Sequence, residues 1–378
     1  MSKQHIPAIE YMRGISMLGV IGIHTGAYSL SNPQVDIHLF AILEIFTRFS
    51  VPIFFFISAF GLFLNQNLNK KLDYTAFMTR RCRTVLIPYL VWSVLYMLHY
   101  TITSGDTYLW SPTVLLEYFL FGLASYQLYF LVILLWFYSL MPLWRIMLRH
   151  ITANPLKNLG ALLLLQIAFN YYSSYLLTPS FANTYLNIAV QYRLSYWVLH
   201  YIFIFLLGAI CALRYHDLTK LFSRYGHYIT AFFFFTLTGM LSFYYYLLYV
   251  KGYSPETAVN IDHQLSPIGV LYTIAATLYW FKLFNSADMP SYLSTSLAEL
   301  GKHSYIIYLF HPFAMYYLIN YFAGFRLVMT VPVTLSFYLL TVIISLYAGV
   351  LVKKLSKPLP IISFLLTGSS MAKKPVNS

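Results

Sequence analysis

Two ionisable side chains interrupt the first long apolar stretch of the sequence, IPAIEYMRGISMLGVIGIHTGAYSL (residues 6–30). Arg13 and His24 are eleven residues apart. In an α-helix this is about 20° beyond three full turns, so both side chains fall on one face, about 16 Å apart along the axis. Imidazole titrates near neutral pH and suits a general base, whereas guanidinium suits a fixed cationic anchor. The spacing favours a catalytic pair, with Arg13 in the cytoplasmic third of the membrane and His24 beyond its midplane.

Both residues also have a structural explanation. Arg13 could extend toward the cytoplasm, and His24 could satisfy a polar contact between helices. Glu10 precedes Arg13 by three residues, so the two can form an ion pair. Small residues on the helix leave room for the close approach of a backbone or a ligand: Gly14, Ser16, Gly19 and Gly22.

A second polar stripe occurs in SYIIYLFHPF (residues 304–313). Ser304, Tyr308 and His311 recur at spacings of four and three, which places them on one helix face. Pro312 loosens the backbone next to His311. We interpret the stripe as a substrate-binding face that lies opposite the first stripe across a cavity. A polar seam between two packed helices is the alternative.

Glu117, in LLEYFLFG (residues 115–122), is a further acidic candidate for the substrate site. It could act as a base or orient a histidine. It could also simply pair with Arg48 or Arg193, so the sequence leaves its role open.

A cluster of three arginines, RRCR, precedes the apolar sequence TVLIPYLVWS (residues 84–93). Arg80, Arg81 and Arg83 can act as a topology signal at the cytoplasmic face. Arginine also binds phosphate in a bidentate manner. We therefore predict that the cluster binds a donor that carries several phosphates.

Apolar helices must position all these residues. Hydrophobic residues make up 59% of the chain and charged residues 9%, against about 25% charged residues in a soluble domain. This composition excludes a soluble enzyme, a disordered chain and a disulfide scaffold, and the long apolar runs exclude a β-barrel. The sequence predicts an all-α, polytopic integral membrane protein with about ten transmembrane helices, over residues 8–31, 41–66, 84–102, 126–147, 158–178, 195–213, 228–249, 266–284, 303–322 and 328–352. The segment 113–125 is too short to span.

Basic residues fall mostly on one side of this arrangement. All but five of the 24 Lys and Arg residues lie on the inner side when the N-terminus is cytoplasmic, which predicts that both termini are cytoplasmic. We expect one transmembrane domain over residues 1–363, a short cytoplasmic tail over 364–378, and free thiols at Cys82 and Cys211. The histidines lack the close spacing of metal ligands, so no metal is expected.

Four of these motifs together resemble the membrane-bound acyltransferase-3 family over most of the chain. They are Arg13-x10-His24, FFFISAFGLF (54–63), the Arg80-x-x-Arg83 element before LIPYL, and SYIIYLFHPF (304–313). The chain is most similar to stand-alone members, which include those of intercellular-adhesion (poly-N-acetylglucosamine) operons and polysaccharide O-acetyltransferases of enterobacteria. Two positions depart from the family pattern, because Glu10 stands where Asp is frequent and Ala59 where Gly is usual.

The resemblance implies an O-acyltransferase of the bacterial cytoplasmic membrane, with acetyl-CoA or another acyl-CoA as co-substrate. The acceptor would be a hydroxyl of a cell-surface glycan or a lipid-linked sugar. By position in the motifs, His24 would be the catalytic histidine, Arg13 its partner, and Arg80 and Arg83 would contact the donor. Membrane lipids and a glycan synthase are further expected partners, and nucleic acid is not.

Direct transfer is the mechanism that we expect, with His24 as the base and Tyr308 or Ser304 as the oxyanion donor. An acyl-histidine intermediate stays open, whereas the absence of a G-x-S-x-G motif disfavours an acyl-serine. Two other functions remain alternatives. One is an exporter or flippase of a glycan synthesis system, and the other is a structural membrane partner of a glycan synthase.

Overall fold

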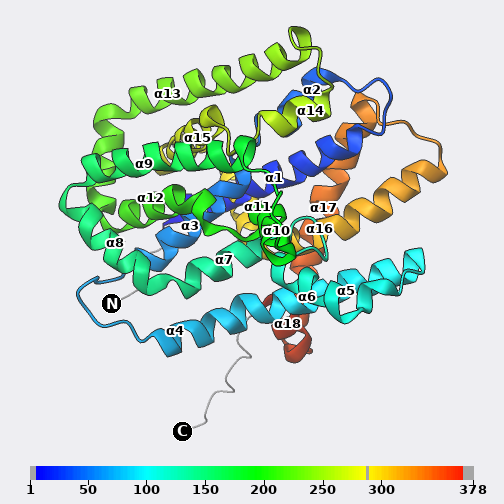
Figure 1. Ribbon diagram of the computed structural model, residues 1–378, viewed down its shortest axis with the longest axis horizontal. Helices are drawn as coiled ribbons and strands as arrows, with labels where there is room; N and C mark the ends of the chain where they lie inside the picture. The colour runs from blue at the N-terminus through cyan, green and yellow to red at the C-terminus, as the bar shows by residue number, and fades with distance from the viewer. Residues whose placement is uncertain (1–5, 287–288, 369–378) are drawn as a thin grey trace.

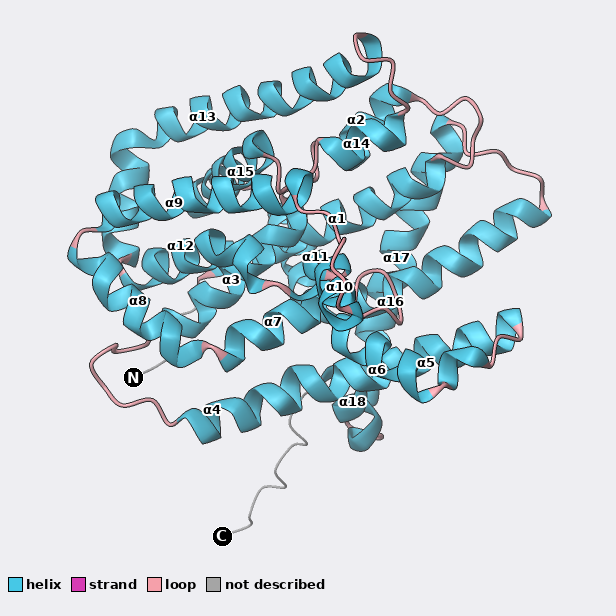
Figure 2. Cartoon of the chain, viewed as in Figure 1, coloured by secondary structure: helices cyan, strands magenta, loops and turns pink. Residues whose placement is uncertain are grey.

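The computed structural model describes residues 6–286 and 289–368, and every regular element in these ranges is a helix (Figure 2). The prediction of an all-α protein is therefore confirmed for the described residues. The α-helices are α1 (Pro7–Ser29), α2 (Ile37–Glu44), α3 (Ser50–Phe63), α4 (Tyr74–Arg81), α5 (Ile87–Ser104), α6 (Pro112–Phe121), α7 (Tyr129–Ser139), α8 (Met141–Ala153), α9 (Pro155–Tyr171), α10 (Thr184–Gln191), α11 (Arg193–Tyr196), α12 (Ile202–Leu213), α13 (Tyr215–Tyr249), α14 (Pro255–Ile261), α15 (Pro267–Ser286), α16 (Ser291–Gly324), α17 (Val331–Leu355) and α18 (Pro360–Thr367).

Four helical segments of the described chain are long and apolar enough to cross a membrane by themselves. They are Tyr74–Ser104, Tyr215–Tyr249, Pro267–Asn285 and Val331–Leu355. A fifth is possible if α7 and α8, which meet at 69°, count as one broken span. Each of the ten predicted ranges overlaps at least one helix. The chain is a membrane protein, while ten spans and cytoplasmic termini remain predictions.

The arginine cluster lies inside a helix, whereas the sequence pattern placed it before the predicted helix over residues 84–102. Asp73 caps α4 by accepting a hydrogen bond from the Ala76 amide, and the helix continues to Ser104 through a π-helical turn, Cys82–Leu86. Pro88 follows this turn. Because proline has no N–H to donate, the regular backbone hydrogen bonding of the α-helix is interrupted there.

Three further boundaries differ from the sequence pattern. The second predicted helix is interrupted over residues 45–49, and the short segment near residue 113 forms α6, which ends at Gly122 with φ 72°. Helix α18 extends over residues 364–367 of the predicted tail. The rest of that tail, residues 369–378, lies outside the described residues.

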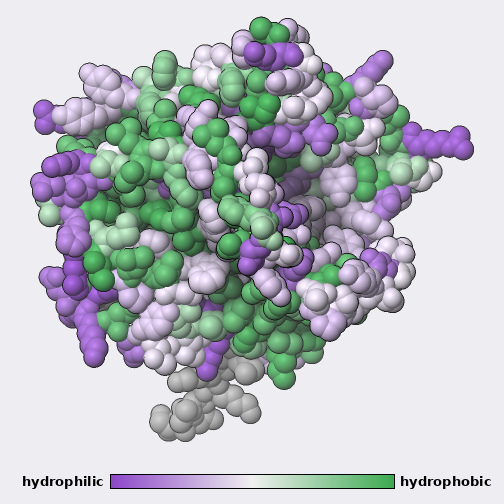
Figure 3. All heavy atoms as spheres, in the orientation of Figure 1, coloured by the Kyte–Doolittle hydropathy of each residue, from purple (hydrophilic) through white to green (hydrophobic). Residues whose placement is uncertain are grey.

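The first helix runs through the interior of the bundle. Figure 1 shows α13 along one edge of the molecule and α4 and α5 along the opposite edge, with α1 between them. Helix α1 packs against α16, α3, α2 and α15. Figure 3 shows hydrophobic residues over much of the visible face, with hydrophilic residues at its margins and near its centre. The polar stripe of α1 therefore faces protein rather than lipid.

Candidate active site

Glycines allow α1 and α16 to approach closely. A Cβ atom on Gly14 would collide with the carbonyl of Leu297, and a Cβ atom on Gly301 would collide with the carbonyl of Glu10. Gly19 of α1 likewise packs against Ser50 of α3. These small residues accommodate neighbouring helices, which is one of the two roles that their pattern left open.

The close packing brings the two histidines together. The rings of His24 and His311 are stacked, with centroids 5.3 Å apart and planes inclined by 23°. The ring of Tyr126 lies 4.3 Å from that of His24. The two histidine-bearing stripes therefore meet at these rings, and the substrate-binding role of the second stripe stays a prediction.

A proline fixes the protonation site of His311. Pro312 lies inside α16 and has no N–H to donate to the carbonyl of Tyr308, four residues earlier. The Nδ1 atom of His311 lies 2.8 Å from that carbonyl oxygen and 3.1 Å from that of Ile307. A carbonyl only accepts hydrogen bonds, so Nδ1 donates, and in the neutral ring Nε2 carries the lone pair. This Nε2 atom is buried and has no hydrogen-bond partner among the described residues.

His24 lines a cavity with an empty volume of about 600 Å³, which we call the histidine chamber. Gln127 lines the same chamber, is 2% exposed, and has no partner among the described residues for either side-chain amide atom. Arg48 lies 2.9 Å from Glu44 through its Nη2 atom, while its buried Nε atom has no partner there. The remaining lining residues are Val20, Ile23, Val51, Tyr129, Phe130, Gln264 and Tyr308.

A larger cavity, with an empty volume of about 1440 Å³, adjoins the histidine chamber. We call it the cationic chamber because Arg13, Arg81 and Lys302 line it, with Glu10 as the acidic residue of its lining. Phe130 and Tyr308 line both chambers and form the wall between them. Arg13 and His24 thus face adjoining internal cavities at successive levels along α1.

The members of the arginine cluster differ in position. The guanidinium carbon of Arg81 lies 5.2 Å from the ring centroid of Phe77 and 5.0 Å from that of Tyr138, and Arg81 lines the cationic chamber. These cation–π contacts hold its charge at the chamber. Arg80 and Arg83 are exposed and do not line either chamber. The sequence spacing alone did not distinguish Arg81, which lines the chamber, from the exposed Arg80 and Arg83.

The stripe of α16 lines both chambers. Ser304 is buried and faces the cationic chamber, and Tyr308 faces both chambers. The hydroxyl of Tyr308 donates to the backbone carbonyl of Gln127. Because its proton is already engaged, Tyr308 is a poor oxyanion donor in this conformation.

Glu117 lies on α6, away from both chambers. Its two suggested partners have other contacts, because Arg48 pairs with Glu44 and Arg193 donates to backbone carbonyls. The geometry therefore gives Glu117 no contact with the histidines and no role in pairing these arginines.

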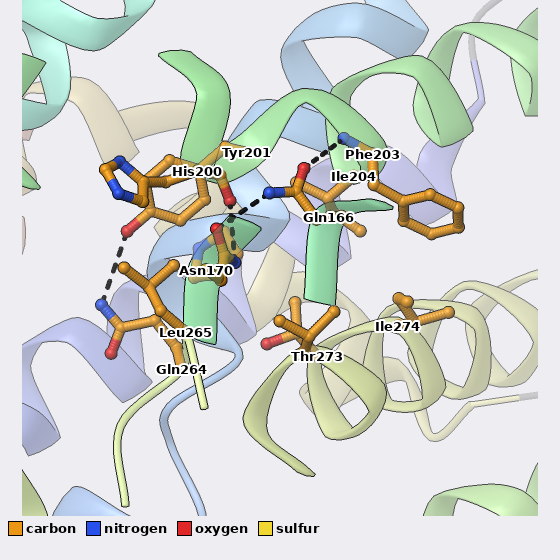
Figure 4. A pocket seen from close by; sticks show the side chains of 12 residues that line it. Gln166, Asn170, His200, Tyr201, Phe203, Ile204, Gln264, Leu265, Thr273 and Ile274 are labelled. Atoms are coloured by element: carbon orange, nitrogen blue, oxygen red, sulfur yellow. Dashed lines mark hydrogen bonds between the residues drawn. The ribbon is translucent and has the colours of Figure 1, made fainter. Parts of the chain in front are cut away.

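A third, smaller cavity has apolar side chains and a cluster of hydrogen-bonded polar groups in its lining (Figure 4). Gln166 donates to the side chain of Asn170 and accepts from the amide of Phe203, and Ser173 lies 2.9 Å from Nε2 of His200. These bonds satisfy backbone groups where the chain breaks before α12. We assign this cluster a structural role.

Sequence reasoning missed the polar residues Arg48, Gln127, Gln264 and Lys302 of the chambers, and Tyr126 beside the ring of His24. A polar Gln127 at the edge of an apolar run was the available signal. Arg48 stood out as a basic residue on the predicted outer side, but the sequence did not connect it with His24.

A family model described as an acyltransferase domain matches residues 6–350. The chain belongs to the acyltransferase-3 family. The matched range contains α1 to α16, most of α17, and both chambers. Membership of the acyltransferase-3 family makes the chain a membrane acyltransferase and gives no support to the exporter alternative. No curated protein and no solved structure matches the chain significantly.

Proposed function

We propose that this protein transfers an acyl group, usually acetyl, from cytoplasmic acyl-CoA to a hydroxyl of a cell-surface glycan or a lipid-linked sugar. The reaction takes place in the bacterial cytoplasmic membrane. One observation carries the proposal. A histidine with a stacked second histidine lines a chamber that shares Phe130 and Tyr308 with a cationic chamber.

The cationic chamber is the proposed donor site. Arg13, Arg81 and Lys302 bring positive charge to it, and guanidinium groups pair well with phosphates. The thioester end of the donor then extends past Phe130 and Tyr308 toward His24. Arg81 takes the main phosphate-binding role, and the exposed Arg80 and Arg83 add long-range attraction.

The chemistry is a direct transfer. The acceptor oxygen attacks the thioester carbonyl carbon while His24 takes the hydroxyl proton. The tetrahedral intermediate then collapses, the carbon–sulfur bond breaks, and the proton held by His24 passes to the CoA sulfur. An ester and free CoA thiol result. Arg48, which carries an unpartnered Nε donor in the same chamber, is better placed than Tyr308 to stabilise the oxyanion.

The test uses the purified full-length protein with labelled acetyl-CoA and glycan acceptors. We expect His24→Ala to lower transfer by at least about a hundredfold, because general-base catalysis contributes roughly that much. Arg13→Ala should mainly raise the KM for acetyl-CoA. Equal labelling by the wild type and both variants would contradict the proposal.

A further inference from the structure

The amide of Gln127 is the least satisfied polar group in the histidine chamber. Both of its side-chain atoms are buried without a hydrogen-bond partner among the described residues. The hydroxyl of Tyr96 lies near this amide, but it donates its proton to the carbonyl of Leu309, 2.7 Å away, so it can only accept from Gln127. Burial of an unpaired amide is unfavourable, so such a group in a cavity indicates a ligand that supplies the missing bonds.

Two further polar side chains reach the same chamber. Arg48 offers an unpartnered Nε donor, and Gln264 enters from the loop between α14 and α15. The side-chain Nε2 atom of Gln264 lies 3.5 Å from the hydroxyl oxygen of Tyr201. The chamber thus presents amide groups that both donate and accept, which suits hydroxyl groups that do the same.

The charges near this site are largely compensated. The charge of Arg48 is balanced by Glu44, whose carboxylate lies 2.9 Å from it. Burial raises the pKa of Asp262, in the same loop as Gln264, to about 8, although the charge of Arg48 acts against this rise. Asp262 is then mostly uncharged at neutral pH. The cationic chamber is more basic, because Arg13, Arg81 and Lys302 line it against Glu10, although Lys302 also pairs with Glu299 at 2.6 Å.

The cavity of Figure 4 contains a buried glutamine that can be compared with Gln127. Its Gln166 is hydrogen-bonded through both amide atoms to other parts of the protein. A glutamine that is satisfied internally has a structural role, whereas Gln127 has bonds left to make. Gln264 lines both cavities, so Gln127 is the group that distinguishes the binding site from the packing cluster.

We propose that Gln127, Arg48 and Gln264 form the acceptor site, and that the acceptor is a neutral, polyhydroxylated sugar. This inference rests on the proposed function and adds the residues and the charge of the acceptor. The sugar lies in the histidine chamber, with one hydroxyl at the imidazole of His24. Donor and acceptor therefore approach the histidine from different chambers.

The test measures binding and transfer separately in the full-length protein reconstituted in nanodiscs. The probes are a neutral N-acetylglucosamine pentamer, its deacetylated cationic form, and an anionic galacturonate pentamer. Gln127→Leu keeps the approximate size and removes the amide, and Gln34→Leu is the control because Gln34 is exposed. Equilibrium binding of each oligomer does not require acyl transfer, so the binding result tests the acceptor site even if the proposed function is wrong.

We expect the wild type to bind the neutral pentamer best, and Gln127→Leu to weaken this binding by at least about tenfold, as loss of a buried hydrogen-bonding group does. The KM for the pentamer should rise similarly, while the KM for acetyl-CoA changes by less than about twofold. Gln34→Leu should alter neither. Failure of the wild type to bind the neutral pentamer, preference for a charged oligomer, or unchanged binding in Gln127→Leu would overturn the acceptor site. Absence of acetyl-CoA turnover alone would overturn only the proposed function.

Discussion

The two stacked histidines are chemically different. His311 donates through Nδ1 to the carbonyl that Pro312 leaves without a backbone partner. Its ring is buried, whereas the ring of His24 borders the chamber. His24 is thus placed to exchange a proton with substrate, and His311 to support the ring that does so.

Pro312→Ala tests this arrangement. The new N–H would compete with His311 Nδ1 for the carbonyl of Tyr308, so the tautomer of His311 should become mixed. We expect transfer to fall by about tenfold, with no loss of thermal stability because alanine favours the helix over proline. NMR of ¹⁵N-histidine-labelled protein reports the tautomer directly. Unchanged histidine signals together with unchanged activity would contradict the role assigned to Pro312.

The buried carboxyl of Asp262 predicts a specific pH dependence of stability. Its pKa is raised to about 8 by burial, so between about pH 4 and pH 8 the folded state holds a proton that the unfolded state has released. The free energy of unfolding should fall over this window and level off above it. Asp262→Asn should therefore stabilise the protein at pH 8 by up to a few kcal/mol, and have little effect near pH 4.

The measurement is the thermal unfolding temperature of the wild type and of Asp262→Asn across this pH range. The variant keeps the size of the side chain, so a gain that grows with pH isolates the charge. A constant difference between the two proteins at all pH values would argue against ionisation as its cause.

At the scale of elements, the α1–α16 contact decides whether the site forms. Gly301 and Gly14 remove the side chains that would hold these helices apart. A β-carbon at either position meets a backbone carbonyl, which cannot move as a flexible side chain can.

Gly301→Ala should therefore lower both the apparent Tm and the transfer rate, the rate by about tenfold or more, since a small displacement separates the histidines. Gly160→Ala on α9 is the matched control, because nothing lies within 4 Å of its added β-carbon. There alanine should stabilise the helix slightly, by up to about 1 kcal/mol. Differential scanning fluorimetry and the labelling assay measure the two effects. A Gly301→Ala protein as active and stable as wild type would show that the contact tolerates separation.

Sequence periodicity predicted these two elements well. Arg13 and His24, and likewise Ser304, Tyr308 and His311, lie on the expected faces because a regular helix fixes its faces by spacing alone. Arg48 and Gln127 could not be placed in this way. Both lie where a helix is interrupted, between α2 and α3 and before α7. Their positions depend on tertiary packing, which local spacing does not encode.

At the scale of the whole molecule, charge is divided between two chambers. Basic residues line the cationic chamber, whereas the histidine chamber has a compensated ion pair and neutral amides. The two substrates should therefore respond differently to ionic strength.

Raising the salt concentration from about 50 mM to about 500 mM should increase the KM for acetyl-CoA severalfold, because screening weakens phosphate binding. The KM for a neutral glycan should stay nearly constant. Arg81→Ala should raise the donor KM at low salt and reduce its salt dependence, whereas the exposed Arg80→Ala should do so less. Steady-state kinetics at several salt concentrations measure all three trends. Equal effects of the two arginine variants would mean that chamber position does not matter.

The wall made by Phe130 and Tyr308 has a consequence for the cell as well as for the reaction. Two closely packed rings, with centroids 5.6 Å apart, separate the chambers. In the proposed reaction only the acyl end of the donor passes between these rings. We therefore expect the partition to keep ions and protons from leaking through the protein during transfer, which preserves the voltage across the membrane.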